Sequence, residues 1–124
     1  MAYQSFEQLH VLQRAIQLAE YVYRSVESMK RFSLKDQMER SSLSIPSNIA
    51  EGQERDAPKD FRRFLRIAKG SSGELRTQSL LSKRLGLLSE EAAEHIVNET
   101  REISAMIQGL IRSIDSKLGA KTSN

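Results

Sequence analysis

Basic side chains between Arg55 and Arg84 offer the most evident chemistry, because they could bind phosphate groups. This segment contains nine lysines and arginines against three acidic residues, a balance of +6, whereas segment 89–118 contains three basic against six acidic residues, a balance of −3. Seven of the basic residues recur in helical register, and such a linear stripe can follow a nucleic-acid backbone. With Arg63 added, the candidate nucleic-acid contacts are Arg55, Lys59, Arg62, Arg63, Arg66, Lys69, Arg76 and Lys83.

Two other interpretations of this stripe remain open. A charged helix face is usually solvated, and the stripe could also pair with the acidic segment 89–118 of a neighbouring copy. Aromatic residues do not interleave the stripe, so stacking of single-stranded bases is unsupported. A protein-interaction scaffold without a nucleic-acid role is therefore the alternative to RNA or DNA binding.

A second group of polar residues surrounds Pro46. Ser47 and Glu51 are four residues apart and share one helical face. Asn48 lies beside them, and Glu74 could join them from the next helix. Such groups could bind a ligand, but they more often satisfy backbone groups that a proline leaves open. We therefore predict a structural role for this polar network.

Metal and enzyme chemistry have little support in the sequence. A di-iron bundle needs two Glu-x-x-His pairs and two further glutamates. Glu7 and His10 form one such pair near a helix end, but the second histidine, His95, follows Ala92 where a glutamate would be needed. The chain has no cysteine, no Gly-x-Ser-x-Gly motif and no glycine-rich phosphate loop. We therefore predict no metal, no cofactor and no enzymatic activity.

Four helices must position these residues, because the apolar spacing is helical throughout the chain. We expect helices at about 6–29, 34–51, 58–85 and 89–118, with Ser5, Ser33 and Ser89 as N-caps. The predicted fold is all-α, an antiparallel up-down-up-down four-helix bundle, with the second helix kinked at Pro46. A chain of 124 residues predicts a single domain, 1–124, with a frayed tail at 118–124.

The first predicted helix carries two apolar seams, which is more than a bundle interior needs. One seam contains Leu9, Leu12, Ile16, Ala19, Tyr23 and Val26. The other would leave an apolar stripe in water, and soluble monomers rarely tolerate such stripes. We therefore predict a homo-oligomer whose interface is formed by Val11, Leu18, Val22 and Met29. In the third helix, Gly70–Gly73 has almost no side chain, which predicts close packing of a neighbour there.

Charge and hydropathy set limits on the location and the partners. No apolar run approaches the roughly 20 residues that cross a bilayer, so we expect no membrane association. The first residues lack the basic and apolar regions of a signal peptide, and we therefore expect a cytoplasmic protein. The net charge of +3 is too small to prove a nucleic-acid partner.

The segment Ser44–Gly52, of sequence SIPSNIAEG, resembles a known family. Further matches follow at 64–71, 74–78 and 85–91. The chain is similar to bacterial four-helix-bundle proteins encoded in intervening sequences of large-subunit ribosomal RNA genes. This resemblance implies an antiparallel bundle assembled as a ring, a pentamer. A distantly similar protein, the accessory factor of diversity-generating retroelements, forms a comparable basic ring that binds nucleic acid.

These observations together favour a non-enzymatic oligomeric binding module. Its partners would be other copies of the chain and either RNA or DNA, which the basic stripe would contact. The alternative is a scaffold that binds another protein. The two hypotheses differ in their response to salt, because phosphate contacts weaken steeply as salt rises whereas apolar docking does not.

Overall fold

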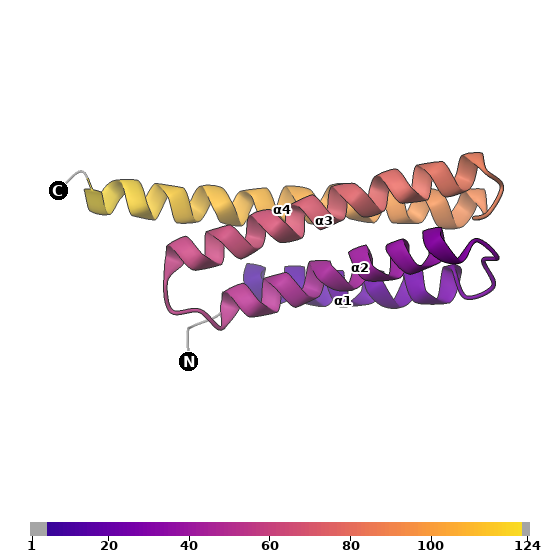
Figure 1. Ribbon diagram of the computed structural model, residues 1–124. Coiled ribbons are helices and arrows are strands. Elements are labelled where there is room, and N and C mark those ends of the chain that lie inside the picture. The colour runs from indigo at the N-terminus through magenta and orange to yellow at the C-terminus, as the bar shows by residue number, and fades with distance from the viewer. Residues whose placement is uncertain (1–4, 123–124) are drawn as a thin grey trace.

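The computed structural model describes residues 5–122, with side chains as far as Gly119. It contains four helices and, within this described part, no strand. The helices are α1 (Phe6–Ser25), α2 (Phe32–Gln53), α3 (Pro58–Arg84) and α4 (Glu90–Thr122), which Figure 1 shows in chain order. The prediction of an all-α chain with four helices is confirmed. None of these helices is long and apolar enough to cross a membrane.

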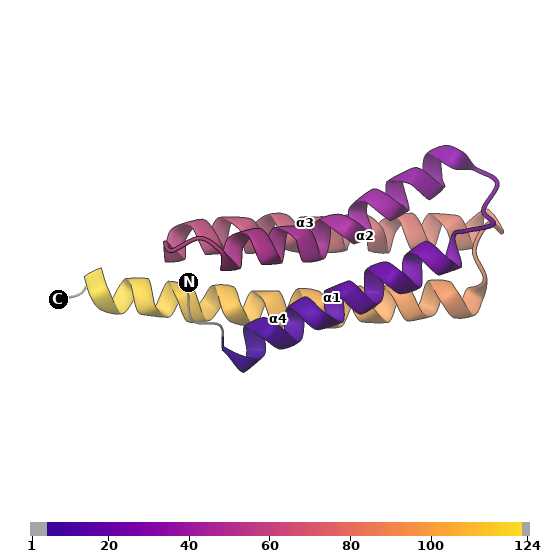
Figure 2. The same ribbon diagram turned by 90° about the horizontal axis from the view of Figure 1, so that it is seen from below.

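Each helix packs against two others. α1 contacts α2 and α4, and α3 contacts the same two helices. Figure 1 shows the turns after α1 and after α3 at one end of the molecule and the turn after α2 at the other end. The C-terminal part of α4 extends past this second turn, as Figure 2 shows from below. The four helices therefore surround one shared interior.

Helix boundaries follow local capping chemistry at three of the four starts. Ser5 accepts a hydrogen bond from the backbone N–H of Gln8 at 3.2 Å, and Ser89 accepts one from Ala92 at 3.1 Å, so both predicted N-caps are confirmed. Pro58 occupies the first turn of α3, where its missing N–H costs nothing. The prediction for Ser33 is wrong, because α2 already begins at Phe32.

Helix ends also differ from the expectations. α1 ends at Ser25 rather than near residue 29. α2 continues through Pro46 to Gln53 as one helix, and Gly52 lies inside it rather than ending it. α4 continues as far as Thr122, beyond its predicted end at residue 118, and residues 123–124 lie outside the described part. Gly86 has a φ of 70°, and the Leu87 N–H bonds the Ser82 carbonyl at 2.9 Å, which closes α3 as a Schellman turn.

The core contains the seam of α1 that we assigned to an oligomer interface. Val11 and Val22 have no exposed surface, and Leu18 and Met29 are buried beside them. The interface prediction is therefore wrong for these four residues, because they pack inside the chain itself. The other seam supplies both buried members, such as Ala19 and Val26, and exposed ones, namely Leu9, Ile16 and Tyr23.

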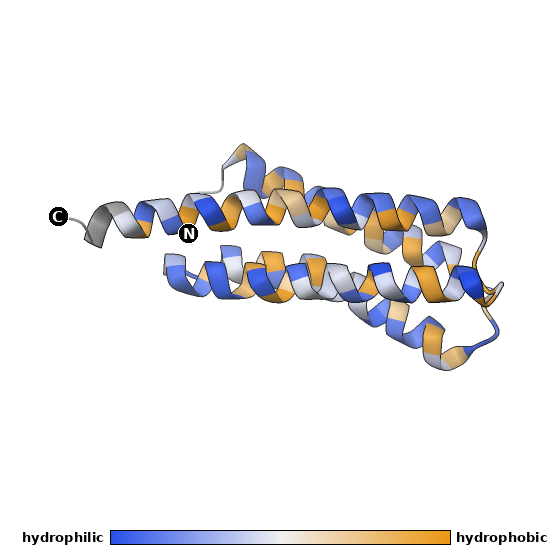
Figure 3. Cartoon of the chain, turned by 90° about the horizontal axis from the view of Figure 1, so that it is seen from above, coloured by the Kyte–Doolittle hydropathy of each residue, from blue (hydrophilic) through white to orange (hydrophobic). Residues whose placement is uncertain are grey.

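Small polar side chains form the part of the core between α3 and α4. The Ser72 hydroxyl donates to the Thr100 carbonyl at 2.9 Å, and the Ser104 hydroxyl donates to the Ser72 oxygen at 2.9 Å. Of the predicted close packing at Gly70–Gly73, Ser71 and Ser72 are buried against α2 and α4. The prediction is wrong for the two glycines, since no atom of another element lies within 4 Å of a Cβ placed at either position. Figure 3 shows the resulting pattern, in which polar and apolar residues interleave along the helices.

Candidate nucleic-acid interface

The predicted basic stripe on α3 divides into two groups. One group contacts α4 of the same chain, and its members follow one another at intervals of seven residues, namely Arg62, Lys69, Arg76 and Lys83. The other group is exposed and consists of Lys59, Arg63 and Arg66, which we call the basic cluster. The alternative expectation was pairing with the acidic segment of a neighbouring copy; within this chain, Arg62 and Lys83 pair with acidic residues of α4, whereas Lys69 and Arg76 bond neutral groups of α4.

The group that faces α4 is held by direct contacts. Arg62 Nη1 donates to Asp115 Oδ1 at 2.5 Å, in an ion pair with side chains 25% and 45% exposed. Lys69 Nζ donates to Gln108 Oε1 at 2.7 Å. A cation that already has an acceptor loses that contact when it turns to a phosphate. These residues are therefore poorer candidates for nucleic-acid binding than an exposed cation that has no such acceptor.

The remaining members of this group follow the same pattern. Arg76 Nε donates to Thr100 Oγ1 at 3.1 Å, and its Nη2 donates to the Thr100 carbonyl at 3.2 Å and to Ser104 Oγ at 3.1 Å. Lys83 Nζ lies 3.6 Å from Glu90 Oε1. Arg76 is half-buried, and its guanidinium donates hydrogen bonds to polar groups of α4.

The basic cluster occupies the N-terminal half of α3. Its three residues are spaced by four and three, so they share one face of the helix over about 10 Å at 1.5 Å per residue. Together with Arg62 and Ile67 they line a hollow of about 490 Å³. The first turn of a helix also carries a positive partial charge from its backbone, which favours anions near Lys59. This open basic surface can attract phosphate but carries no group for covalent chemistry.

Aromatic stacking holds two arginines at this end of α3. The guanidinium carbon of Arg63 lies 4.4 Å from the centre of the Phe64 ring, and that of Arg55 lies 5.0 Å from the same ring. Arg55 also lies 3.8 Å from Glu51 Oε2, so its charge is partly balanced. Cation–π contact restricts the side-chain freedom of Arg63 and leaves its donors available. The sequence did not lead us to predict the cation–π contacts of Phe64, although its position next to Arg63 was a signal of such a contact.

The predicted polar network around Pro46 is only partly assembled. Asn48 Nδ2 donates to the Ser44 carbonyl at 2.8 Å and to Ser44 Oγ at 2.9 Å, and the Ser44 and Ser71 hydroxyls are 2.8 Å apart. Ser47 and Glu51 are exposed on the surface of α2. The network therefore joins α2 to α3 through Ser44 and Ser71, neither of which was in the predicted set.

A second contact of the same kind lies one turn away. Ser41 Oγ donates to Gln78 Oε1 at 2.6 Å. Glu74 is exposed and lines a small hollow of about 250 Å³ beside these residues. The spacing of Ser41, Ser44 and Asn48 by three and four is a signal from which a helix-to-helix polar seam could have been predicted.

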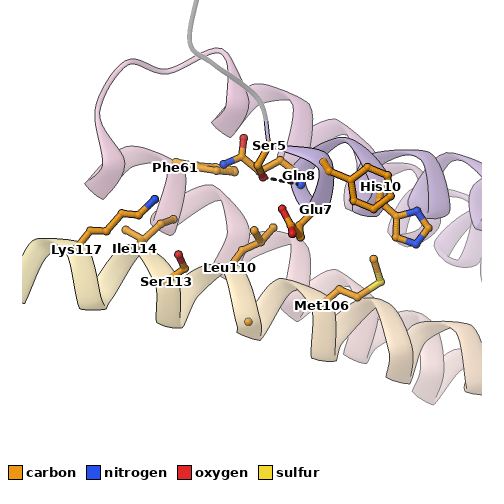
Figure 4. Close-up of a pocket in the computed structure, with 12 residues that line it drawn as sticks. Ser5, Glu7, Gln8, His10, Phe61, Met106, Leu110, Ser113, Ile114 and Lys117 are labelled. Carbon is orange, nitrogen blue, oxygen red and sulfur yellow. Dashed lines mark hydrogen bonds between the residues drawn. The ribbon is translucent and has the colours of Figure 1, made fainter.

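The Glu7–His10 pair lies at a larger hollow of about 550 Å³ between the first turns of α1 and the C-terminal half of α4. Figure 4 shows Glu7 pointing into this space above Leu110 and Ser113, with His10 beside Met106. The His10 ring stacks on Phe6 with centroids 5.8 Å apart. Within residues 5–119, no three His, Cys, Asp or Glu side chains come together as a metal site would need. The other histidine, His95, packs on Tyr21 at 4.2 Å.

An ion pair joins α1 to α4. Arg14 Nη2 donates to Glu99 Oε2 at 2.7 Å, and Arg14 Nε donates to Glu99 Oε1 at 3.1 Å. Glu102 lies 3.4 Å from the same guanidinium. The hydrogen bonds to Glu99 raise the pKa of Arg14 above its ordinary value, and the nearby negative charges act in the same direction. This pair fixes α1 on the acidic helix α4 at the far side of the bundle interior from the basic cluster.

Comparison with known proteins assigns the chain to a family. The family model of 23S rRNA-intervening sequence proteins matches residues 7–109. A crystal structure of a protein of unknown function from the S23 ribosomal protein family of Bacteroides thetaiotaomicron is similar to this structure, with a TM-score of 0.80 and 25% identity over 86% of this chain and 99% of that chain. No curated protein sequence matches the chain. The chain therefore belongs to the 23S rRNA-intervening sequence protein family.

Proposed function

We propose that this protein is a non-enzymatic, oligomeric binding module that contacts the phosphates of RNA or DNA through its basic cluster. The observation that carries this proposal is the exposure of Lys59, Arg63 and Arg66 on one face of α3. Their span of about 10 Å corresponds to about three successive phosphates of one strand, at 3.4 Å of helix axis each. The family's name connects it with ribosomal RNA genes, which is consistent with this partner class.

The structure narrows the surface that the sequence suggested. Eight basic residues were candidates, but those at intervals of seven along α3 already bond α4. We therefore assign phosphate binding to the basic cluster, with Arg55 at its edge. Backbone contacts of this kind position a protein on nucleic acid without reading its sequence. The proposed module accordingly binds without strong sequence preference.

The alternative is a scaffold that docks another protein. Exposed apolar side chains favour it, because Leu80 and Leu81 on α3 and Leu85 beyond its end leave about half of their surface in water. Docking on such residues depends on apolar area and responds weakly to salt. The salt dependence of binding therefore separates the two functions.

Filter binding with mixed-sequence RNA and DNA duplexes between 50 and 200 mM salt tests the proposal. The logarithm of affinity should fall linearly with the logarithm of salt, with a slope of about −0.9 for each phosphate that is neutralised. Three contacts per chain give a slope of about −2.7, which is a loss of about 40-fold over this fourfold range of salt. If the protein retains no RNA or DNA on the filter at 50 mM salt, nucleic acid is not its partner.

A charge-matched pair of variants locates the interface. The variant Lys59→Gln, Arg63→Gln, Arg66→Gln should lose most of the salt dependence. The control removes three positive charges at the opposite end of the molecule, where Lys30, Arg31 and Arg84 are exposed. If both variants lose the same affinity, binding depends on net charge and the assignment to the basic cluster is wrong.

Several finer features of this proposal stay predictions. The family resemblance implies that the assembly is a ring of five subunits. In Figure 1 the three turns lie at alternating ends of the molecule, which supports the up-down-up-down order of the helices. The kink at Pro46, the single-domain organisation and the cytoplasmic location are likewise expectations from the sequence.

A further inference from the structure

Two turns lie beside each other at one end of the bundle. The turn after α1 leads into Phe32, the first residue of α2, and the turn after α3 starts at Leu85. The Ser82 hydroxyl donates to Met38 Sδ at 3.4 Å, so the first turns of α2 lie beside the last turn of α3. Figures 1 and 2 both show the two turns together at this end. Residues of both turns therefore contribute to one surface.

Large apolar side chains protrude from this surface. Phe32 is 77% exposed, Leu85 is 55% exposed, and Leu81, four residues before Leu85 on the same face of α3, is 48% exposed. We call these three residues the apolar tip. The turn at the other end of α3, residues 54–57, contains no large apolar residue. Figure 3 shows hydrophobic residues, in orange, at the end that carries the apolar tip.

Exposed cations flank the apolar tip. In each turn an arginine directly precedes the protruding residue, Arg31 before Phe32 and Arg84 before Leu85, and Lys30 lies next to Arg31. All three cations are exposed, and within the described residues none of them forms an ion pair. Their donors are therefore available to an anionic partner that also accepts the apolar side chains.

Acidic residues near the apolar tip only partly offset these cations. Two of them already pair with other cations, namely Asp36 with Arg40 and Glu90 with Lys83. Glu27 and Glu91 are the other exposed carboxylates of the two turns and the helix starts beside them. The three cations of the turns exceed these two by one charge. The surface is therefore weakly basic, and its cations lie directly beside its apolar residues.

We propose that the apolar tip docks this protein on the surface of a bilayer that contains anionic lipids. Phenylalanine and leucine side chains bind at the boundary between headgroups and acyl chains, and lysines and arginines beside them attract lipid phosphates. Side chains that protrude from turns at the end of a bundle fit a surface that deforms around them. A protein partner would instead need a cavity of matching shape.

Surface docking of this kind does not require a helix that crosses the bilayer. The sequence expectation of no membrane association considered only such helices, and surface docking replaces it. The surface is also separate from the basic cluster, because Arg84 lies 18 residues beyond Arg66 on α3, which is about 27 Å. The proposed nucleic-acid interface therefore stays accessible when the apolar tip is on a membrane.

Cosedimentation of the full chain with lipid vesicles tests this inference. One preparation contains phosphatidylcholine alone, and the other contains phosphatidylcholine and phosphatidylglycerol in equal amounts. The native protein should partition at least about tenfold more strongly onto the anionic vesicles, because each cation near such a surface adds attraction. A native protein that stays in the supernatant with both preparations overturns the inference.

A matched pair of variants tests the apolar contribution. Phe32→Ser, Leu85→Ser keeps the net charge and should lower partition onto anionic vesicles at least about tenfold. The control Phe6→Ser, Leu43→Ser changes the same residue types at positions that are 78% and 51% exposed, and should leave partition unchanged. Phe6 is the first residue of its helix, as Phe32 is, so the two variants perturb a helix start equally.

Two triple variants test the cations. Lys30→Gln, Arg31→Gln, Arg84→Gln should weaken binding to anionic vesicles about fivefold for each cation. The triple variant of the basic cluster removes the same charge and should leave vesicle binding unchanged. In filter binding with nucleic acid the two variants should exchange these effects. Failure of membrane docking is therefore distinguishable from failure of the proposed function.

The remaining outcomes are equally decisive. If Phe32→Ser, Leu85→Ser binds vesicles as the native protein does, the attraction is electrostatic alone, an acidic protein surface would serve as well, and the inference is wrong. An equal loss in the control Phe6→Ser, Leu43→Ser also overturns it. Circular dichroism shows whether each variant is folded. If the double variant unfolds, Leu85→Ser alone provides the same test with a smaller expected loss.

Discussion

Replacement of Gly52 by alanine probes the contact between the end of α2 and the start of α3. A Cβ atom at Gly52 would lie 2.8 Å from Phe61 Cδ1 and 2.9 Å from Phe64 Cβ. The Phe61 ring could rotate slightly, but the Cβ of Phe64 is attached to the backbone of α3 and cannot move alone. The substitution therefore forces the first turns of α3 away from α2.

Two opposing effects set the size of the change. Overpacking a well-packed site costs about 1–3 kcal/mol. Alanine in place of glycine inside a helix gains about 1 kcal/mol. For Gly52→Ala we expect a net loss of up to about 2 kcal/mol in the free energy of unfolding, because the contact with the α3 backbone outweighs the helix preference. For a chain of this length, this corresponds to a decrease in Tm of up to about 8 °C.

The control is Gly70→Ala, which changes the same residue type inside α3. No neighbouring atom lies within 4 Å of a Cβ at Gly70, so only the helix preference applies. We expect a gain of up to about 1 kcal/mol. Thermal unfolding of both variants at one protein concentration measures the difference, since assembly makes Tm depend on concentration. A Gly52→Ala protein as stable as Gly70→Ala would refute the packing argument.

Three further substitutions test individual polar contacts by chemical unfolding. Ser79→Ala should leave the free energy of unfolding unchanged or raise it by up to about 1 kcal/mol, because its buried hydroxyl has no hydrogen-bond partner among the described residues; a clear loss would contradict this. Arg14→Met should cost about 1–2 kcal/mol, because Glu99 loses two hydrogen bonds, and an unchanged midpoint would show that solvent replaces them. Arg76→Met should also lower the free energy of unfolding by about 1–2 kcal/mol, because Arg76 donates hydrogen bonds to Thr100. Duplex affinity at 50 mM salt should stay within twofold. A large loss of affinity would show that Arg76 contacts the nucleic acid.

Local signals predicted the helices well. The serine caps at Ser5 and Ser89 act within one turn, so their hydrogen bonds depend on residues close in sequence. The core seam of α3 is also a local signal, because its steps of three and four carry a single line of small and apolar residues, and Leu65 and Leu75 are fully buried. Such features need no knowledge of the neighbouring helices.

Features that depend on neighbouring helices were harder to predict. α1 has two seams with the same period, and nothing local distinguishes Val11 and Leu18 from Leu9 and Ile16. The seam that faces inward is decided by where α2 and α4 lie. The basic stripe posed the same problem, because the acceptor of Arg62 is Asp115, which lies 53 positions away in sequence. Periodicity placed the cations on α3 but could not show which of them face α4.

The four cations that bond α4 have a consequence for the alignment of the two helices. As their numbers rise along α3, their partners fall along α4, from Asp115 for Arg62 to Glu90 for Lys83. If α3 slid by one turn, about 5.4 Å, each cation would miss its acceptor at the same time. The buried leucines and isoleucines of the two helices also oppose such a slip. This ladder of polar contacts therefore favours the same register as the apolar core, a role that polar residues also have in coiled coils.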